Sequence, residues 1–441
     1  MSGHQTSTLT SGVRVVSERI EGVRSVALGF WVGTGSAMES EEQAGLSHLL
    51  EHMLFRGTDS YRSHEIDELF DAMGAEVNAG TDRETTSLYT RVMDRHLKRA
   101  FEAAAEMVWR PRLESLEAER EVVLEEIAMY EDDPQDRVFD VLGGAVFGEH
   151  PLGRAVIGDA AVVGAVTLER LKAFHEARYL PGDVVIAAAG SVDHETLVEL
   201  ASAAGPDRHD AAGPAGAGES DGGDVPGTVV EGRPVWSEPA FERRVKFLAK
   251  DTEQYHFCLG GPGIGRHDER RFALRVLEGI LGGTSSSRLF QEVRERKGLA
   301  YSVFTFSAQY EQTGEVGVYV GTRPDNLGEA VATIANELER AIEKPASAAE
   351  LERSRENLKG RVALSLESTS ARMNRLGSSL LGGLPIYSVE EIFERIDAVT
   401  IEDLKELAGE LFAPEALSAA GVGADEGVFL KALAPLGKVA A

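Results

Sequence analysis

Apolar and polar residues alternate along this chain in the two periods that distinguish strands from helices. Val-rich alternating segments predict strands at residues 13–16 and 26–32, and a charged loop containing glycines follows at 33–43. A further alternating segment, 75–92, crosses a Gly-Thr-Asp turn and predicts a hairpin. Apolar residues at helical spacing predict helices at 45–58, 64–73, 116–130 and 168–179, and a buried strand follows at 184–189.

The segment 45–58, GLSHLLEHMLFRGT, places ligand-type side chains inside an apolar helix. His48 and His52 are four residues apart and share one helix face, and Glu51 lies beside them. Zinc accepts two imidazoles held one turn apart, and a neighbouring carboxylate can take a proton from a metal-bound water. The pattern H-x-x-E-H is the inverzincin signature. It also arises by chance, so a pair of ordinary helix histidines remains the alternative until a third ligand is found.

The glutamate-rich helix at 116–130 is the candidate source of that third ligand. Zinc in a catalytic site takes three protein ligands and keeps one position for water. Within EREVVLEE, Glu119 and Glu126 are seven residues apart and lie on one face, whereas Glu121 and Glu125 lie off it. We expect Glu126 to bind the metal, and Glu119 to orient an imidazole or to steady Glu126. An ordinary solvated helix face is the alternative for such a run of glutamates.

Two parts of the chain resemble each other in sequence. AVTLERLK at 165–172 returns as AVTIEDLK at 398–405, and a shift of 227 residues lays Phe30 on Phe257. The same shift lays the H-x-x-E-H segment on RVLEG at 275–279, which keeps the glutamate and has neither imidazole. We therefore expect an α+β fold of two tandem homologous domains, each a largely antiparallel sheet covered by helices.

A segment of low complexity separates the two expected domains. Residues 202–227 contain almost no large apolar side chains, so burial cannot offset the entropy of ordering them. We expect a flexible linker there, with a low-complexity binding segment as the alternative. The expected domains are a catalytic, zinc-binding domain at 1–201 and a homologous domain without metal at 228–441.

Composition narrows the class of protein and its partners. The chain has 441 residues, 43% hydrophobic and 27% charged, with no apolar run long enough to span a membrane, which is typical of a soluble protein with several domains. The first residues lack a secretory signal, and the single Cys258 excludes an internal disulfide framework, so a cytoplasmic location is expected. A net charge of −28 argues against nucleic acid and anionic membranes as partners. The acidic surface either suits high salt or selects cationic peptides.

Several separated motifs carry a resemblance to a known family. GLSHLLEHMLFRGT, NAGTDRETTSLY, EREVVLEE and GGTSSSRLFQEVRERKGLAYSV resemble, in this order, motifs of the pitrilysin/insulinase family of zinc metallopeptidases. Within it the chain is similar to the bacterial processing-peptidase-like branch, relatives of the mitochondrial processing peptidase β subunit. The similarity covers nearly the whole chain except residues 202–227. It implies one zinc ion per chain held by His48, His52 and Glu126, with Glu51 as general base and Glu119 as an assisting glutamate.

The resemblance also implies where a peptide binds and how subunits assemble. Asn78 and Ala79 match the sheet edge on which family members hold an extended peptide by strand addition. Arg294 and Tyr301 match a pair that reaches the active site from the opposite side, with a surface arginine and a core tyrosine as the alternative. Single-chain relatives with four such domains carry this pair in the last one. For a chain of two domains, this implies a homodimer whose pair serves the zinc of the partner subunit inside a closed chamber.

The expected function is a zinc-dependent endopeptidase acting on unfolded peptides or short presequence-like segments. No ligand or base of the family pattern is substituted in this sequence, so activity is expected. Two alternatives share the fold: a non-catalytic scaffold subunit, and a module that captures peptide strands without cleaving them. The intact zinc motif argues against the scaffold, and chelator-sensitive turnover would distinguish the strand-capturing module.

Overall fold

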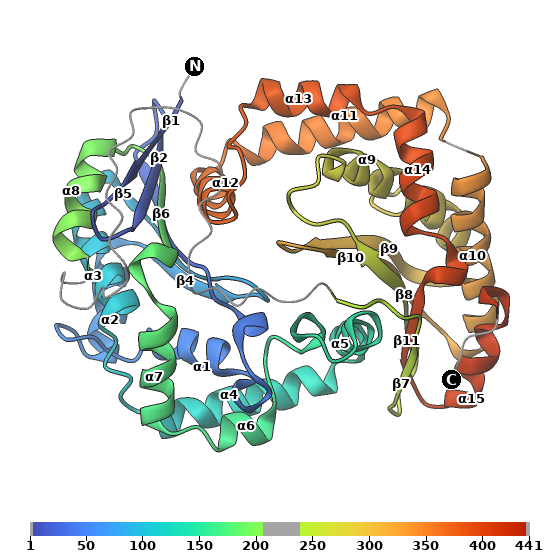
Figure 1. Ribbon diagram of the computed structural model, residues 1–441, viewed down its shortest axis with the longest axis horizontal. Coiled ribbons are helices and arrows are strands. Elements are labelled where there is room, and N and C mark those ends of the chain that lie inside the picture. Colours follow the sequence, from blue (N-terminus) through green and yellow to red (C-terminus); the bar gives the residue numbers. More distant parts are fainter. Residues whose placement is uncertain (1–2, 206–238, 345, 438–441) are drawn as a thin grey trace. The chain divides into compact units, whose positions relative to one another are not determined.

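The computed structural model describes residues 3–205, 239–344 and 346–437 (Figure 1). The chain divides into two compact units, each with its own sheet. Unit 1 takes Met1–Glu125, Val156–Val235 and Leu364–Ile386, and unit 2 takes Glu126–Ala155, Trp236–Ala363 and Tyr387–Ala441. The expected linker at 202–227 lies outside the described residues, except for its first residues, which end α8 (His194–Ala204) and follow it.

Unit 1 is built on a six-stranded sheet in the order β1-β2-β6-β3-β5-β4. Its strands are β1 (His4–Thr8), β2 (Arg14–Arg19), β3 (Ser25–Val32), β4 (Glu76–Thr81), β5 (Thr86–Met93) and β6 (Val184–Gly190). Only β2 and β6 pair in parallel; the other neighbours are antiparallel. Within the described part of the chain, β1 and β4 are the two edges. The strands and the hairpin expected from the alternating segments are confirmed, but the expected Gly-Thr-Asp turn is misplaced: Gly80 and Thr81 belong to β4, and the turn covers residues 82–85.

Helices cover both faces of this sheet. α3 (Leu97–Trp109) and α8 pack on one face, and α12 (Thr369–Leu381) packs on the other, against β2, β3 and β6 (Figure 1). Val16, Ala187 and Ala189 form an apolar cluster with Met373 and Leu376 of α12. Successive side chains of a strand point to opposite faces, so the intervening residues of β2 and β6 face α3 and α8. The other helices are α1 (Leu46–Met53), α2 (Ser63–Met73), α6 (Ala160–Gly164) and α7 (Leu168–Arg178), with α4 (Leu116–Asp132) running into unit 2.

Unit 2 has a five-stranded sheet in the order β7-β11-β8-β10-β9. Its strands are β7 (Val245–Ala249), β8 (Tyr255–Gly263), β9 (Ala300–Gln309), β10 (Gly314–Thr322) and β11 (Ser418–Gly423). β7 and β11 pair in parallel, and the remaining pairs are antiparallel. Its helices are α5 (Pro134–Phe147), α9 (Arg271–Leu281), α10 (Leu327–Glu343), α11 (Ala348–Ser365), α13 (Val389–Ala398), α14 (Ile401–Leu411) and α15 (Glu426–Ala432).

The two sheets repeat one topology. The order β2-β6-β3-β5-β4 in unit 1 corresponds to β7-β11-β8-β10-β9 in unit 2, with the parallel pair in the same place. α1 follows β3, and α9 follows β8, at corresponding points of the chain. The expected α+β fold of two homologous, largely antiparallel domains is therefore confirmed. The expected domain boundaries at 201 and 228 stay a prediction.

In each unit, one of the helices that cover the sheet comes from the half of the sequence that forms the sheet of the other unit. α5 precedes residue 202, yet it packs on β7, β8 and β11 of unit 2. α12 follows residue 228, yet it covers the sheet of unit 1. A buried ion pair strengthens the second contact, because Arg372 and Arg375 of α12 both bind the carboxylate of Glu18 in β2. Neither sequence half therefore completes its own core.

The described residues contain no helix that could span a membrane. None combines the length and the apolar composition needed to cross a bilayer.

Candidate functional site

The helix that carries the zinc motif begins at a tightly packed corner. Gly45, its N-cap, has φ of 102°, and a Cβ there would lie 2.7 Å from Val163 Cγ2 and 3.1 Å from the Cα of Gly158. The buried carboxylate of Glu39 accepts hydrogen bonds from the backbone N–H groups of Gly45 (2.9 Å) and Ser47 (2.6 Å). A carboxylate at this end also interacts favourably with the helix dipole. These contacts hold the start of α1 in a single position.

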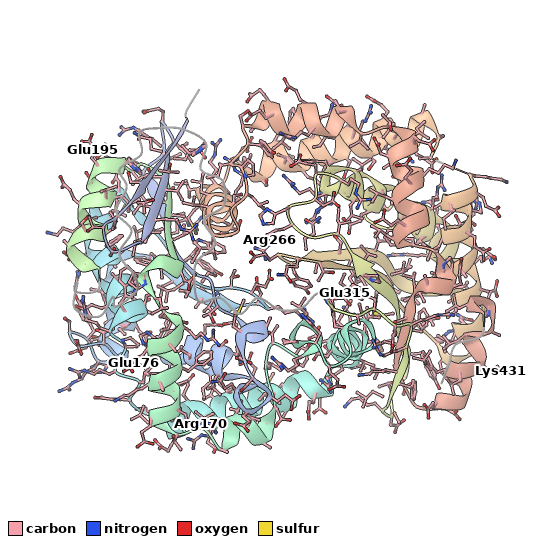
Figure 2. All side chains as sticks on the ribbon, viewed as in Figure 1. Arg170, Glu176, Glu195, Arg266, Glu315 and Lys431 are labelled. Atoms are coloured by element: carbon pink, nitrogen blue, oxygen red, sulfur yellow. The ribbon has the colours of Figure 1, made fainter. Side chains whose placement is uncertain are left out.

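The loop before α1 is anchored to α7 as well. Arg178 donates to the carbonyl oxygen of Met38 at 2.7 Å. Arg170, labelled in Figure 2, donates to the carbonyl oxygen of Glu42 at the same distance. Two arginines of α7 therefore hold the loop that leads into α1, the helix with the zinc motif.

α1 presents its polar residues on one side and buries the other. Leu46, Leu49, Leu50 and Met53 are buried, as the apolar pattern requires. The rings of His48 and His52 lie with their centroids 4.7 Å apart, edge to face. The helix ends at Met53 and is shorter than the expected 45–58, because Gly57 adopts φ of 115° and Thr58 forms a bridge with Pro111. The shorter helix still contains the whole H-x-x-E-H motif.

Three ligand-type side chains converge beside α1. One ligand atom each of His48, His52 and Glu126 lie within 4.8 Å of one another. Ligand atoms roughly 2.0–2.2 Å from a tetrahedral zinc ion lie about 3.3–3.6 Å apart, so this group can close on the metal with small side-chain movements. Two imidazoles and one carboxylate are also a donor set that catalytic zinc uses. Among the residues described, no second group of three such side chains comes together.

Glu126 reaches this group because α4 is a continuous helix. The division between the units falls between Glu125 and Glu126, inside α4. Val123 and Ile127, on either side of the ligand, are buried, and Glu119 of the same helix contacts His52 directly. The helix therefore carries Glu126 into place beside the histidines.

Glu119 lies directly behind His52. The residue is only 3% exposed, and its Oε1 is 2.9 Å from His52 Nδ1. When Nδ1 donates its proton to this carboxylate, Nε2 is left as the metal-binding nitrogen. Arg56, four residues after His52 and beyond the end of α1, forms an ion pair with the other oxygen of Glu119. Glu119 therefore contacts both His52 and Arg56, and its role as an orienting residue stays a prediction.

His48 is held in its neutral form. Burial, together with the smaller effect of the nearby charge of His52, lowers the pKa of His48 to about 4. An imidazole must be neutral to bind a metal. His48 can therefore bind a metal at neutral pH without first losing a proton.

This shift predicts an acid-sensitive fold of the metal-free protein. His48 takes up a proton near pH 6.5 when unfolded and only near pH 4 when folded, so the unfolded state binds more protons between these values. We expect the free energy of unfolding to fall as the pH falls through this window, by up to ~3 kcal/mol from His48. Urea unfolding of metal-free wild type and His48→Gln at several pH values measures it. Equal pH dependence in the two proteins would contradict this assignment.

Glu51 is held by the hairpin beside it. The hydroxyl of Thr81, the last residue of β4, donates to Glu51 Oε2 at 2.7 Å. Tyr179 is buried nearby: burial raises the pKa of Tyr179 above its usual value, and the charge of Glu51 raises it further. Glu51 thus lies in a packed site beside both histidines of the metal group.

Asn78 and Ala79 lie on β4, an edge strand within the described part of the sheet. Asn78 is exposed and pairs with Tyr89 across the hairpin, while Ala79 pairs with Leu88. The N–H of Ala79 donates to Asn78 Oδ1 at 2.9 Å. As an edge strand, β4 has backbone groups that a further strand could pair with. One of its backbone N–H groups, that of Ala79, already donates to the side chain of Asn78.

Arg294 and Tyr301 form a pair within unit 2. Arg294 lies in the π-helix at Phe290–Arg296, and Tyr301 lies in the edge strand β9. Arg294 Nη1 donates to the Tyr301 carbonyl oxygen at 3.1 Å, and its guanidinium carbon is 4.3 Å from the centre of the Tyr301 ring. Tyr301 is 77% exposed and is not a core residue. The arginine thus supports a tyrosine that projects into solvent.

The corresponding helix of unit 2 has no room for the second histidine. Gly279 takes the place of His52, and a Cβ at Gly279 would lie 2.5 Å from Ser354 Oγ of α11. Glu278, at the place of Glu51, is buried, and burial raises the pKa of its carboxyl group. The segment of unit 2 that corresponds to the zinc motif is therefore packed into the interior of unit 2.

Sequence reasoning missed four residues that support the site: Glu39, Arg56, Thr81 and Tyr179. Arg56 lies only four residues after His52 in the sequence, but α1 ends at Met53, so helical spacing does not account for its contact with Glu119. Glu39 and Thr81 form hydrogen bonds with α1, and Tyr179 lies close enough for the charge of Glu51 to affect its pKa, but no helix or strand periodicity reveals these relations.

Two family models match this chain. The model described as "Insulinase (Peptidase family M16)" matches residues 14–160, and the one described as "Peptidase M16 inactive domain" matches residues 165–358. An uncharacterized zinc protease of Bacillus subtilis is 38% identical over 410 residues, covering 92% of this chain and 95% of that protein. An uncharacterized zinc protease of Mycobacterium tuberculosis is 39% identical over 415 residues, covering 92% and 90% respectively.

Solved structures share the fold at lower identity. A protease from Helicobacter pylori superposes with a TM-score of 0.83 at 22% identity, covering 96% of this chain and 99% of that one. A peptidase M16 inactive domain from Pseudomonas fluorescens gives a TM-score of 0.84, also at 22% identity, covering 96% and 98%. These likenesses support the fold, and the closer relatives carry the family relationship.

Proposed function

This chain belongs to the insulinase family, peptidase family M16, and from that premise we propose that it is a zinc-dependent endopeptidase cleaving unfolded peptides or presequence-like segments. The single observation that carries the proposal is the convergence of His48, His52 and Glu126. Glu51 lies on the same helix as the two histidines. A scaffold protein has no need of an intact ligand set and an adjacent base.

In the proposed mechanism, His48, His52 and Glu126 would hold one zinc ion. When bound there, zinc supplies Lewis acidity that polarises a peptide carbonyl and makes water acidic near neutral pH. Glu51 accepts a proton from the attacking water and later delivers it to the departing amine. Glu119 would favour the His52 tautomer that leaves Nε2 available to a metal, and Arg56 would keep Glu119 in place.

We propose that the peptide adds as a strand to the β4 edge. Its carbonyl oxygens would accept hydrogen bonds from edge N–H groups, and the first of these is the N–H of Ala79. That N–H donates to Asn78 Oδ1 in the peptide-free protein, so peptide binding exchanges one acceptor for another. Strand addition reads main-chain groups, which suits unfolded peptides of varied sequence.

We further propose a homodimer in which Arg294 and Tyr301 act on the zinc site of the partner subunit. The exposed Tyr301 hydroxyl is a donor suited to the charge that develops on the carbonyl oxygen during attack. Arg294 stacks on the ring and holds the Tyr301 backbone, so it fixes the direction of that hydroxyl. The two sites of the dimer would face a closed chamber. We also propose that the protein is cytoplasmic.

Removal of the metal tests the proposed function. We expect the purified full chain to contain one zinc ion and to cleave members of a quenched-fluorescence peptide library. A chelator should abolish cleavage, and added zinc should restore it, because no side chain of the site replaces Lewis acidity. Cleavage that persists in zinc-free protein would contradict the proposal. Full zinc occupancy without cleavage of any peptide would instead favour the scaffold function.

A further inference from the structure

We propose that Thr81 is a positioning residue that joins the peptide-binding strand to the general base. Thr81 is the last residue of β4, and its hydroxyl donates to Glu51 Oε2 at 2.7 Å. The proposal rests on the proposed function, since it assigns Thr81 a role in the same site. No spacing in the sequence points to it, because Thr81 and Glu51 are thirty residues apart.

The hydroxyl proton of Thr86 already has an acceptor, so the hydrogen bond between Thr81 and Glu51 has a defined direction. Thr86, paired with Thr81 across the hairpin, donates to the carbonyl oxygen of Thr34 at 2.9 Å. A hydroxyl has a single proton, so Thr86 has none to offer Thr81, whose Oγ1 is 3.5 Å away. The proton of Thr81 in turn goes to Glu51, a charged acceptor at a shorter distance.

This hydrogen bond fixes the rotation of the Glu51 carboxylate. A carboxylate rotates about its terminal bond with little resistance unless one oxygen is held. With Oε2 held by Thr81, the other oxygen keeps a defined direction, as proton transfer requires. The hairpin holds Thr81 in turn, because Thr86 is 1% exposed and tied to the loop at Thr34.

The same contact links substrate binding to catalysis. β4 is the edge strand to which the peptide is proposed to add, and Asn78 and Ala79 lie three and two residues before Thr81. A peptide paired with β4 would stiffen the strand and with it the position of Thr81. The contribution of Thr81 should therefore appear in kcat, while peptide affinity and zinc content stay unchanged.

A matched pair of threonines allows a controlled experiment. Thr85, in the turn of the same hairpin, also donates its hydroxyl to a carboxylate, Asp82, at 2.9 Å. We expect Thr81→Val to lower kcat by roughly tenfold or more, with KM and zinc content kept, because a hydrogen bond to a charged group is lost. Thr81→Ser should restore most of the rate, and Thr85→Val should behave as wild type.

A second measurement is independent of metal and activity. Thermal unfolding of metal-free wild type, Thr81→Val, Glu51→Ala and the double variant forms a double-mutant cycle, because each single substitution removes the hydrogen bond. A measurable coupling between the two positions supports the contact. Unchanged kcat in Thr81→Val, no rescue by Thr81→Ser, or additive effects in the cycle would overturn the proposal. A wild type that cleaves nothing would overturn only the proposed function, and the unfolding cycle would still decide the role of Thr81.

Discussion

Glu51→Gln is expected to lower kcat for peptide cleavage by a factor of ~10² to 10⁴ while zinc stays bound. Glutamine keeps the shape of the side chain and can still accept the hydrogen bond from Thr81, but it cannot take a proton from water. Glu51 is not one of the three side chains that converge as ligands, so the zinc content should remain at the wild-type value. Steady-state kinetics on a cleaved library peptide and metal analysis of the same sample measure both quantities.

Glu125 provides the matched control for this substitution. It lies on α4 directly before Glu126, is exposed, and points off the ligand face. Glu125→Gln makes the same chemical change and should leave both kcat and zinc content unaltered. If Glu51→Gln also loses zinc, or keeps more than about a tenth of the wild-type kcat, the role of general base is wrong.

The part of the site that sequence reasoning could supply is the part that lies on one helix. His48, Glu51 and His52 share a face because of their spacing, whatever the rest of the fold does. Glu126 is different, since its approach to the histidines depends on the packing of α4. Spacing indicated Glu126 but left a solvated glutamate face open as an alternative, and the family resemblance argued for Glu126. The structure brings it within reach of both histidines.

The fold shows the same division between local and tertiary information. Alternation and turn residues were enough to predict the strands and the hairpin of unit 1, and the internal repeat predicted the second sheet. The exchange of α5 and α12 had no such signal, because an amphipathic helix carries no record of which sheet it covers. Glu18 illustrates this limit: its partners, Arg372 and Arg375, lie more than three hundred residues away. Only the folded chain identifies such pairs.

The proposed homodimer depends on a single testable feature, a site shared between subunits. Tyr301→Phe removes the hydroxyl that we assign to the developing charge, and one lost oxyanion donor costs about 10² to 10³ in kcat. Arg294 would still stack on the phenylalanine ring and bind the backbone carbonyl, so the fold should be kept. Tyr301→Phe and Glu51→Gln chains should therefore each be nearly inactive alone.

Mixing the two inactive variants is expected to restore about a quarter of the wild-type rate. After free exchange, half of the dimers contain one chain of each kind. In each mixed dimer, the zinc site of the Tyr301→Phe chain keeps Glu51 and receives an intact Tyr301 from its partner, while the other site has lost both groups. Subunit exchange is verified by mass spectrometry of differently tagged chains, and wild type mixed with Glu51→Gln gives the reference for dilution. If proven mixed dimers stay as inactive as the parents, the sites are not shared in trans, because only a composite site can regain both groups.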